Sequence, residues 1–249
     1  MFAVHHNLLF DLDQTLLDFH ASEHFALRAV MARNGQDITE DDYAFFKQIN
    51  KGLWLEFEKG MITKTELFER RFGRLFEARG CDTGSIDLLK VNDDFIDCMS
   101  HNGFLMDGVT DFLEKVTAEL PDAGIYVITN GVSRNALGRI ASTGLDKYIS
   151  RVFVSEELGY SKPAREYFDI VTEAVGEPAE SYIVIGDSLT SDMLGAKNAH
   201  LTSCWFTAEG NTEEAMKEYS IDYTASSFDE LFEVISAWAA LSSADKQGL

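Results

Sequence analysis

The sequence predicts an α/β protein, a doubly wound parallel sheet with a Rossmann-like core and an inserted all-helical cap domain. Three apolar runs, NLLF, GIYVIT and SYIVIG, show no polar alternation, which is typical of parallel strands covered on both faces. Helical patterns alternate with these runs along most of the chain, as in doubly wound folds. Residues 20–100 break the alternation, because they contain several helical patterns and no convincing strand.

Six segments are expected to form the sheet, and they are short and rich in β-branched or aromatic side chains. In chain order they are Asn7–Phe10, Gly124–Thr129, Arg151–Val154, Ser181–Gly186, Thr202–Phe206 and a short edge at Ile221–Thr224. Apolar residues at helical spacing predict the helices that cover the sheet. One stripe is Val109, Phe112, Leu113 and Val116, and another is Phe228, Leu231, Phe232, Ile235 and Trp238.

The helical insert follows the first strand directly and ends at the segment HNGF. Its helices are expected at Ala21–Arg33, Asp41–Asn50, Lys64–Arg79 and Ser85–Met99. This arrangement predicts a core domain of residues 1–18 and 104–241 and a cap domain of residues 19–103. The polar end of the chain, residues 242–249, is expected to be a disordered tail.

Composition restricts the classes of partner. The chain of 249 residues carries 42 acidic and 21 basic side chains, which gives a net charge of −21. Such a surface repels phosphate backbones and anionic lipids, so binding to nucleic-acid polymers or membranes is not expected. Three scattered cysteines predict reduced thiols in a cytoplasmic protein, and no segment has the pattern of a membrane span or signal peptide. A monomer or weak homodimer is expected.

Polar residues follow the buried strands at the points where those strands end. They are Asp11 and Asp13 after the first strand, Thr129, Asn130 and Gly131 after the second, and Asp187 after the fourth, with Lys162 in the segment SKP. In open α/β sheets this edge is where ligands bind. The shared placement at strand ends, more than any single short motif, predicts an active site.

The two neighbouring carboxylates indicate what kind of site this is. Asp11 and Asp13 project to the same side of an extended chain. At about 4 Å they would repel by about 4 kcal/mol at an effective dielectric of about 20. A cation between them or protonation of one relieves this repulsion. A divalent ion held by Asp11 and Asp187 provides the first solution, and oxygen-only ligands suit Mg²⁺. A protonated Asp13 provides the second and would act as an acid.

A phosphoryl group fits this set of residues. The charges of a phosphate dianion, Asp11 and Asp187 are nearly balanced by those of Mg²⁺ and Lys162. The phosphate oxygens would also accept hydrogen bonds from the Thr129 hydroxyl and from the backbone N–H groups of the Asn130–Gly131 turn. The residues thus predict phosphate binding by Thr129, Asn130, Gly131 and Lys162.

The same residues predict a two-step hydrolysis. Asp11 would attack phosphorus and form an aspartyl-phosphate, while Asp13 would protonate the leaving oxygen and then deprotonate the water that clears the intermediate. A purely structural interpretation exists for each residue taken alone. Asp11 and Thr129 can cap helices, and Lys162 can form a surface ion pair.

The segments DLDQTL, ITNG, SKP and GDSLTSD, in this order, resemble the four motifs of the haloacid dehalogenase (HAD) superfamily of phosphohydrolases. The helical insert resembles the C1-type cap of that superfamily. The resemblance implies a phosphatase with Mg²⁺ as cofactor, Asp11 as nucleophile and Asp13 as acid/base. It further implies that Asp11, the backbone carbonyl of Asp13, and Asp187 hold the metal, and that Asp192 supports the metal ligands or Lys162. True dehalogenases of the superfamily lack a carboxylate at the position of Asp13.

Substrate choice is expected to depend on the cap. The segments QINKGLWLEF and LLDFHASEHFAL resemble the pyrimidine 5′-nucleotidase branch, which is credited with removing non-standard nucleotides. This implies a nucleoside 5′-monophosphate as substrate, with Trp54 or Phe57 stacking on the base and Lys51 contacting the phosphate or the base carbonyls. The alternative for the aromatic residues is packing within an amphipathic cap helix. A sugar-phosphate phosphatase or phosphomutase shares all four motifs and stays open as an alternative function.

Two residues depart from the pattern of relatives, which commonly have glycine at both positions. Gln14 lies inside the first motif, where polar residues are tolerated. His200 lies in the segment NAHL, at a helix end where a left-handed backbone is expected. We expect a small loss of stability at His200 and no loss of function.

Overall fold

The computed structural model describes residues 5–207 and 213–244. Within these ranges six parallel strands form one sheet in the order β3-β2-β1-β4-β5-β6, which confirms the predicted doubly wound fold. The strands are β1 (Asn7–Phe10), β2 (Gly124–Thr129), β3 (Arg151–Val154), β4 (Tyr182–Gly186), β5 (Thr202–Phe206) and β6 (Tyr223–Ala225). The predicted ranges of β1, β2, β3 and β5 are confirmed, while β4 starts one residue later and β6 is shifted toward the C-terminus.

Eleven α-helices accompany the sheet within the described ranges. They are α1 (Phe19–Arg33), α2 (Glu40–Glu58), α3 (Lys64–Ala78), α4 (Leu88–His101), α5 (Val109–Glu119), α6 (Ser133–Thr143), α7 (Ser155–Leu158), α8 (Arg165–Val175), α9 (Leu194–Ala199), α10 (Glu213–Tyr219) and α11 (Phe228–Ala244). Short helical turns lie at η1 (Thr83–Ser85), η2 (Leu145–Lys147), η3 (Ala179–Ser181) and η4 (Leu189–Met193). Helix α2 differs most from expectation, because it continues past Asn50 to Glu58.

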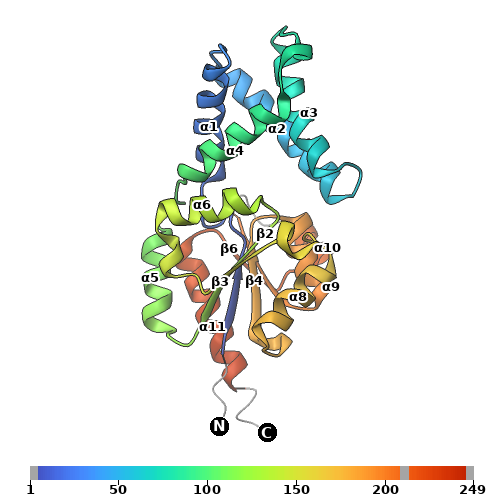
Figure 1. Cartoon of the computed structure of the whole chain (residues 1–249). Helices are drawn as coiled ribbons and strands as arrows, with labels where there is room; N and C mark the ends of the chain where they lie inside the picture. The colour runs from blue at the N-terminus through green and yellow to red at the C-terminus, as the bar shows by residue number, and fades with distance from the viewer. Residues whose placement is uncertain (1–4, 208–212, 245–249) are drawn as a thin grey trace.

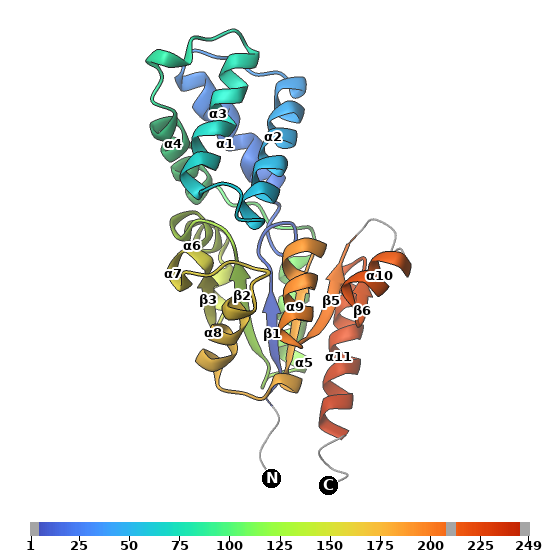
Figure 2. The ribbon, with the colours of Figure 1, turned by 90° about the vertical axis from the view of Figure 1, so that its right-hand side faces the viewer.

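Helices cover both faces of the sheet, with α5 and α11 on one side and α8 and α9 on the other (Figure 1, Figure 2). Residues of β1 alternate between the two layers. Phe10 packs edge to face against Phe112 of α5, whereas Leu9 belongs to the core formed with Phe168 of α8. Both strand residues are fully buried, which explains why the strand is an unbroken apolar run.

Helices α1–α4 form a bundle at the carboxyl end of the strands (Figure 1). The two segments that connect the bundle to the sheet pair with each other, since Asp18 N donates to Phe104 O (2.9 Å) and Met106 N donates to Leu16 O (3.1 Å). The predicted boundaries of residues 19–103 fall in these paired segments. The division into a core domain and a cap domain stays a prediction.

Capping residues determine where two helices of the bundle begin. Asp18 accepts a hydrogen bond from the first turn of α1, and Thr63 and Glu66 form a reciprocal capping box at the start of α3. Each cap satisfies N–H groups that have no partner inside the helix, which is worth about 1 kcal/mol. As a result Phe19 and Lys64 occupy the first positions of their helices, both close to the strand ends.

Both positions that depart from the pattern of relatives have a left-handed backbone. His200 follows α9 with φ 58° and ψ 37°, so the left-handed conformation predicted at this helix end is confirmed. Gln14 has φ 63°, and its Oε1 accepts a hydrogen bond from His20 N (3.2 Å). The left-handed region costs a non-glycine residue about 1–2 kcal/mol, and this explains why glycine suits both positions.

Two further expectations concern membrane-spanning helices and the C-terminal end of the chain. In residues 5–207 and 213–244, no helix has both the length and the apolar character that crossing a membrane requires. Of the predicted tail, residues 242–244 are the last turn of α11, and residues 245–249 lie outside the described residues.

Candidate active site

A cavity of about 200 Å³ lies between the carboxyl ends of the strands and the helical bundle. It is lined by Asp11, Asp13, Phe19, Trp54, Glu58, Thr129, Asn130, Gly131, Lys162, Asp187, Ser188, Ser191 and Asp192. The residues that the sequence predicts for catalysis, phosphate binding and metal binding therefore come together in one place. A larger cavity of about 600 Å³ beside α5 and α11 contains none of them.

Asp11 is the first residue after β1, and its backbone holds it at the edge of the sheet, where its N–H donates to Ile185 O of β4 (2.8 Å). The residue is buried, with 7% of its surface exposed. Its Oδ1 lies 2.6 Å from Nζ of Lys162. A buried carboxylate is tolerated only when it is paired and hydrogen-bonded, and Lys162 meets this requirement.

Asp13 is paired with a different cation. Its Oδ1 lies 2.6 Å from Nη1 of Arg139 on α6. The Arg139 side chain is fully buried, whereas 29% of the Asp13 side-chain surface is exposed. The two neighbouring carboxylates thus have separate partners, Lys162 for Asp11 and Arg139 for Asp13. From the sequence, a shared cation or a protonated carboxylate is expected to relieve the repulsion between Asp11 and Asp13. The structure shows a third way to relieve it, an arginine paired with Asp13.

Lys162 is 1% exposed, which excludes the surface ion pair considered from the sequence. Its Nζ donates to Asp11 Oδ1 (2.6 Å), Asp192 Oδ1 (2.6 Å) and Ile128 O (3.0 Å). These three bonds use all three hydrogens of an ammonium group. A phosphate oxygen that accepts from Lys162 must therefore replace one of these acceptors.

Asn130 joins two of the motif loops through its side chain. Its Nδ2 donates to Lys162 O and its Oδ1 accepts from Lys162 N, both at 2.8 Å. The Lys162–Pro163 peptide bond in this segment is cis. Gly131 N donates to Thr129 Oγ1 (3.0 Å), which leaves the hydroxyl hydrogen of Thr129 for another acceptor. The Asn130 side chain thus positions Lys162, and the Thr129 hydroxyl is left to meet a ligand.

Three carboxylates form a group that could hold a metal ion. Asp11, Asp187 and Asp192 each present an oxygen within 4.8 Å of the other two. A set of oxygen ligands suits Mg²⁺. Asp192 is fully buried and also accepts from Ser188 N (3.1 Å), which orients the loop after β4. A Cβ at Gly186 would lie 2.3 Å from Asp192 Oδ2, so only glycine fits before Asp187.

Burial, more than crowding, raises the pKa values of Asp11 and Asp187. Burial, followed by the charge of Asp192, raises the pKa of Asp187 to about 7. Burial also raises the pKa of Asp11 well above its usual range, although Lys162 opposes the shift. For Lys162, burial lowers the pKa, but the carboxylates of Asp11 and Asp192 outweigh burial and the net direction is upward. The group therefore holds more negative charge than one lysine neutralises, which favours a divalent cation.

The helical bundle closes the cavity from the opposite side. Trp54 and Glu58 lie one helical turn apart at the end of α2, and both line the cavity. Glu58 Oε2 accepts from Thr190 Oγ1 (3.2 Å), and burial raises the pKa of Glu58. At the start of α3, Lys64 Nζ donates to Gly131 O (3.2 Å). The bundle therefore contacts the loops that follow β2 and β4.

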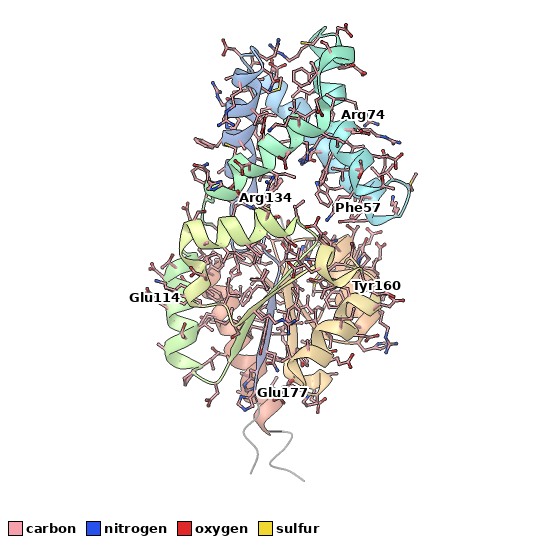
Figure 3. The ribbon with its side chains drawn as sticks, viewed as in Figure 1. Phe57, Arg74, Glu114, Arg134, Tyr160 and Glu177 are labelled. Carbon is pink, nitrogen blue, oxygen red and sulfur yellow. The ribbon has the colours of Figure 1, made fainter. Side chains whose placement is uncertain are left out.

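The three predicted specificity residues differ in their placement. Trp54 lines the cavity, whereas Lys51 is exposed and neither Lys51 nor Phe57 is among the lining residues. Phe57 lies at the end of the bundle nearest the sheet, as Figure 3 shows. It packs edge to face against Trp54, with ring centroids 5.6 Å apart. Trp54 is therefore the predicted specificity residue best placed to meet a substrate.

Some site residues are absent from the sequence prediction. They are Phe19, Glu58, Ser188 and Ser191 in the lining, and Arg139 behind Asp13. Two of them leave a signal in the sequence. Arg139 lies on the same helical face as Ala136 and Ile140, and arginine is rare on a buried face unless it is paired. Glu58 lies four residues after Trp54, so a helix that continues to Glu58 places both on one side.

Known proteins resemble most of the chain. The family model of haloacid dehalogenase-like hydrolases matches residues 6–200. HAD-hydrolase YfnB from Bacillus subtilis is 36% identical over 217 residues, which cover 86% of this chain and 90% of YfnB. Pyrimidine 5′-nucleotidase PynA from Streptococcus pneumoniae is 32% identical over 217 residues, with the same two coverages. Pyrimidine 5′-nucleotidase YjjG from Escherichia coli is 31% identical over 229 residues, which cover 92% of this chain and 96% of YjjG.

A solved structure supports the same relationship. The crystal structure of YfnB bound to magnesium superimposes with a TM-score of 0.83 and 33% sequence identity, and the match covers 94% of this chain and 99% of that one. That structure is described as revealing interdomain movement. The fold of this chain is therefore that of the matched structure.

Proposed function

The chain belongs to the haloacid dehalogenase-like hydrolases, and from this membership we propose that it hydrolyses nucleoside 5′-monophosphates, with pyrimidine nucleotides preferred. It is a phosphoric monoester hydrolase. The observation that carries the substrate proposal is that Trp54 of the helical bundle lines the same cavity as Asp11 and Lys162. An aromatic ring in this place can stack on a base while the phosphate lies among the motif residues.

Asp11 and Asp13 line the same cavity, and this supports the proposal of a two-step hydrolysis in which they take different roles. Asp11 attacks phosphorus as the bond from phosphorus to the leaving oxygen breaks, which gives an aspartyl-phosphate. Asp13 gives its proton to the leaving oxygen, so that a neutral alcohol departs. In the second step Asp13 takes a proton from water, which attacks phosphorus and releases phosphate and Asp11. Thr129 and Lys162 hold the phosphate oxygens during both steps.

Magnesium fits the carboxylate group as the cofactor. The residues that would hold it are Asp11, Asp187 and the backbone carbonyl of Asp13, with Asp192 orienting Lys162 and the loop after β4. When bound, the ion neutralises charge on the phosphate and the carboxylates. The match to the magnesium-bound structure of YfnB supports this choice.

Mg²⁺ is expected to stabilise the protein against heat. A ligand at about 100 times its Kd adds about 2.7 kcal/mol, which raises the melting temperature of a chain of this size by about 5–10 °C. Thermal melts with EDTA and with Mg²⁺ measure the shift. Asp187→Asn should remove most of it, whereas Asp169→Asn on the exposed side of α8 should leave it unchanged. An equal shift in the Asp187 variant would contradict the metal assignment.

The acidic surface and the free thiols agree with a small intracellular substrate. A net charge of −21 disfavours nucleic-acid polymers and membranes, so we propose a small phosphorylated compound as the partner. Cys81, Cys98 and Cys204 are all free, which is typical of a reducing compartment, and we propose the cytoplasm.

A direct test compares phosphate release from a nucleotide and from the same molecule without its base. Trp54→Ala should lower kcat/KM for uridine or cytidine 5′-monophosphate about 10-fold or more, because base stacking is worth about 1–3 kcal/mol. It should leave ribose 5-phosphate within about twofold. Phe57→Ala is the matched control, since Phe57 packs on Trp54 but does not line the cavity.

Two outcomes would overturn the substrate proposal. An equal loss on both substrates in the Trp54 variant, together with a lower melting temperature, would show that Trp54 only packs the bundle. A preference of the unmodified enzyme for sugar phosphates over all nucleotides would favour the alternative function. Neither outcome affects the assignment as a phosphatase.

A further inference from the structure

Arg139 has no role in the proposed reaction so far, yet it faces the centre of that reaction. The residue lies on α6 and none of its side chain is exposed. Its Nη1 lies 2.6 Å from Asp13 Oδ1, and its guanidinium carbon lies 5.6 Å from the ring centroid of Phe19. Within the described residues, Nε, Nη1 and Nη2 have no hydrogen-bond acceptor of good geometry.

A second buried arginine shows how unusual this environment is. Arg71 of the helical bundle is 3% exposed, and it is held by the side-chain oxygens of Asn92 and Asn50. It also lies over the ring of Phe95, with its guanidinium carbon 4.7 Å from the centroid. The direct acceptors of Arg71 are therefore neutral, and the nearest counter-charge, the buried carboxylate of Glu23, accepts a hydrogen bond from Asn50 and opposes the lowering of the Arg71 pKa by burial. The described partners of Arg139 are one carboxylate and one aromatic ring.

Burial of an ion costs several kcal/mol unless the ion is well paired. A packing role alone would be served better by an apolar side chain of the same volume, as replacements of buried ion pairs have shown. The guanidinium of Arg139 therefore needs an explanation in terms of its partner. That partner is Asp13, the group that must hold, give and take a proton.

The local fold fixes the position of Arg139 relative to Asp13. Helix α6 begins at Ser133, directly after the loop of Thr129, so the helix connects the arginine to the phosphate-binding loop. Asp13 lies in the segment that leads into the helical bundle and pairs with Leu17 in an isolated bridge. The ion pair therefore joins the phosphate loop to the segment that connects the sheet to the bundle.

We propose that Arg139 is a positioning residue that orients the Asp13 carboxylate toward the leaving oxygen. The proposal rests on the proposed function. Oδ1 of Asp13 lies against Nη1 of the buried Arg139, so the ion pair limits rotation of the carboxylate and leaves its other oxygen for the leaving group. Because Arg139 is held on α6, this orientation exists before the substrate binds, as preorganisation requires.

The proposal predicts a leaving-group effect. Arg139→Met keeps the length of the side chain and removes its charge. With substrates whose leaving oxygen needs a proton, such as alkyl phosphates or nucleotides, the rate of leaving-group release in the first turnover should fall about 10- to 100-fold. With p-nitrophenyl phosphate this first-turnover rate should fall about threefold or less, because this leaving group departs without a proton. The substrate concentration that gives half of the first-turnover rate should change little for either substrate, since Arg139 does not line the cavity.

Three comparisons separate positioning from packing. Arg139→Lys restores the positive charge and should recover most of the loss. Arg71→Met removes the other buried arginine, and should lower the melting temperature without changing the ratio of the two first-turnover rates. In the double variant Asp13→Asn with Arg139→Met, the loss with poor leaving groups should be no larger than in Asp13→Asn alone. The reason is that both replacements act through the same carboxylate, that of Asp13.

The outcomes distinguish this proposal from the proposed function. If Arg139→Met lowers the first-turnover rate equally for both substrates, or matches Arg71→Met, the positioning role is wrong. If Asp13→Asn itself shows no leaving-group selectivity, the role of Asp13 fails first and the function must be revised. If Arg139→Met does not fold, Arg139→Lys decides. This variant keeps the positive charge. If it has a normal melting temperature and still loses about 10- to 100-fold with substrates that have a poor leaving group, the proposal is contradicted.

Discussion

Replacing Asp11 by asparagine is expected to abolish turnover, with a loss of at least about 1,000-fold in kcat for every phosphate ester. The carboxylate is the proposed attacking group, and an amide oxygen cannot form a stable acyl phosphate. The change is nearly isosteric, so the amide side chain should still occupy the space at the end of β1. Phosphate release from p-nitrophenyl phosphate and from a nucleotide measures the loss.

The fold itself should survive this replacement. Lys162 keeps Asp192 and Ile128 O as acceptors, so its ammonium is not left unpaired. Asp222→Asn is a matched control, because Asp222 also accepts hydrogen bonds from a strand, at Ser203 of β5, but lies away from the cavity. The control should retain activity within about twofold. Turnover above about one tenth of normal in a folded Asp11 variant would exclude Asp11 as nucleophile.

The strands and the residues at their ends that line the cavity could be predicted from the sequence for the same physical reason. A parallel strand covered on both faces must be apolar throughout, so the first polar residue after it marks the edge of the sheet. Asp11, Thr129 and Asp187 lie where such runs end, and all three line the cavity. At these positions the local sequence pattern and the overall fold both place a polar residue at the edge of the sheet. One amino-acid sequence, without related sequences, is therefore enough to locate the cavity.

The end of α2 could not be placed from the sequence, because packing overrides local preference there. Gly52 lowers helix stability by about 1 kcal/mol relative to alanine. The apolar residues on both sides of it, Ile49 and Leu53, are buried in the bundle and compensate for this cost. The additional turns of α2 carry Trp54 and Glu58 to the cavity. Because the sequence predicts the end of this helix too early, the prediction lacks Glu58 among the residues that face the substrate.

The two cations of the site could not both be assigned from the sequence. Lys162 belongs to the recognisable segment SKP, whereas Arg139 is one of several arginines in helices and its partner is distant in the chain. The ion pair joins residues about 126 positions apart, and only the fold brings them together. Long-range pairs of this kind leave no periodic signal. The closest sign is an arginine on the apolar face of α6.

The contacts between the helical bundle and the sheet indicate that the cavity is shaped by both. Lys64 reaches the carbonyl oxygen of Gly131, and Glu58 accepts from Thr190. These bonds attach the ends of α2 and α3 to the loops that carry the proposed phosphate-binding and metal-binding residues. A substrate that enters the cavity therefore meets groups from both parts at once, which is the arrangement needed to read a base and a phosphate together.

Asp13→Asn is expected to separate the two halves of the proposed chemistry. A positioned acid contributes about 100- to 10,000-fold when the leaving oxygen needs a proton, and much less when it does not. The variant should therefore lose about 100-fold or more in kcat with a nucleotide, while the first step with p-nitrophenyl phosphate is slowed by about tenfold or less. A burst of p-nitrophenolate should then precede slow steady-state release, because water lacks its base in the second step.

The buried guanidinium of Arg139 next to Asp13 means that Asp13→Asn can also lower the stability of the protein. Asparagine still offers an oxygen to Arg139, but it leaves the buried guanidinium without a counter-charge, and breaking a buried pair can cost about 3–5 kcal/mol. Melting temperatures must accompany the kinetics, with assays well below the transition. Arg139→Met in the same background removes the unpaired charge and should restore part of the lost stability without restoring hydrolysis of the nucleotide. Equal slowing of both substrates in a folded Asp13 variant, with no burst, would show that Asp13 is not the acid that protonates the leaving group.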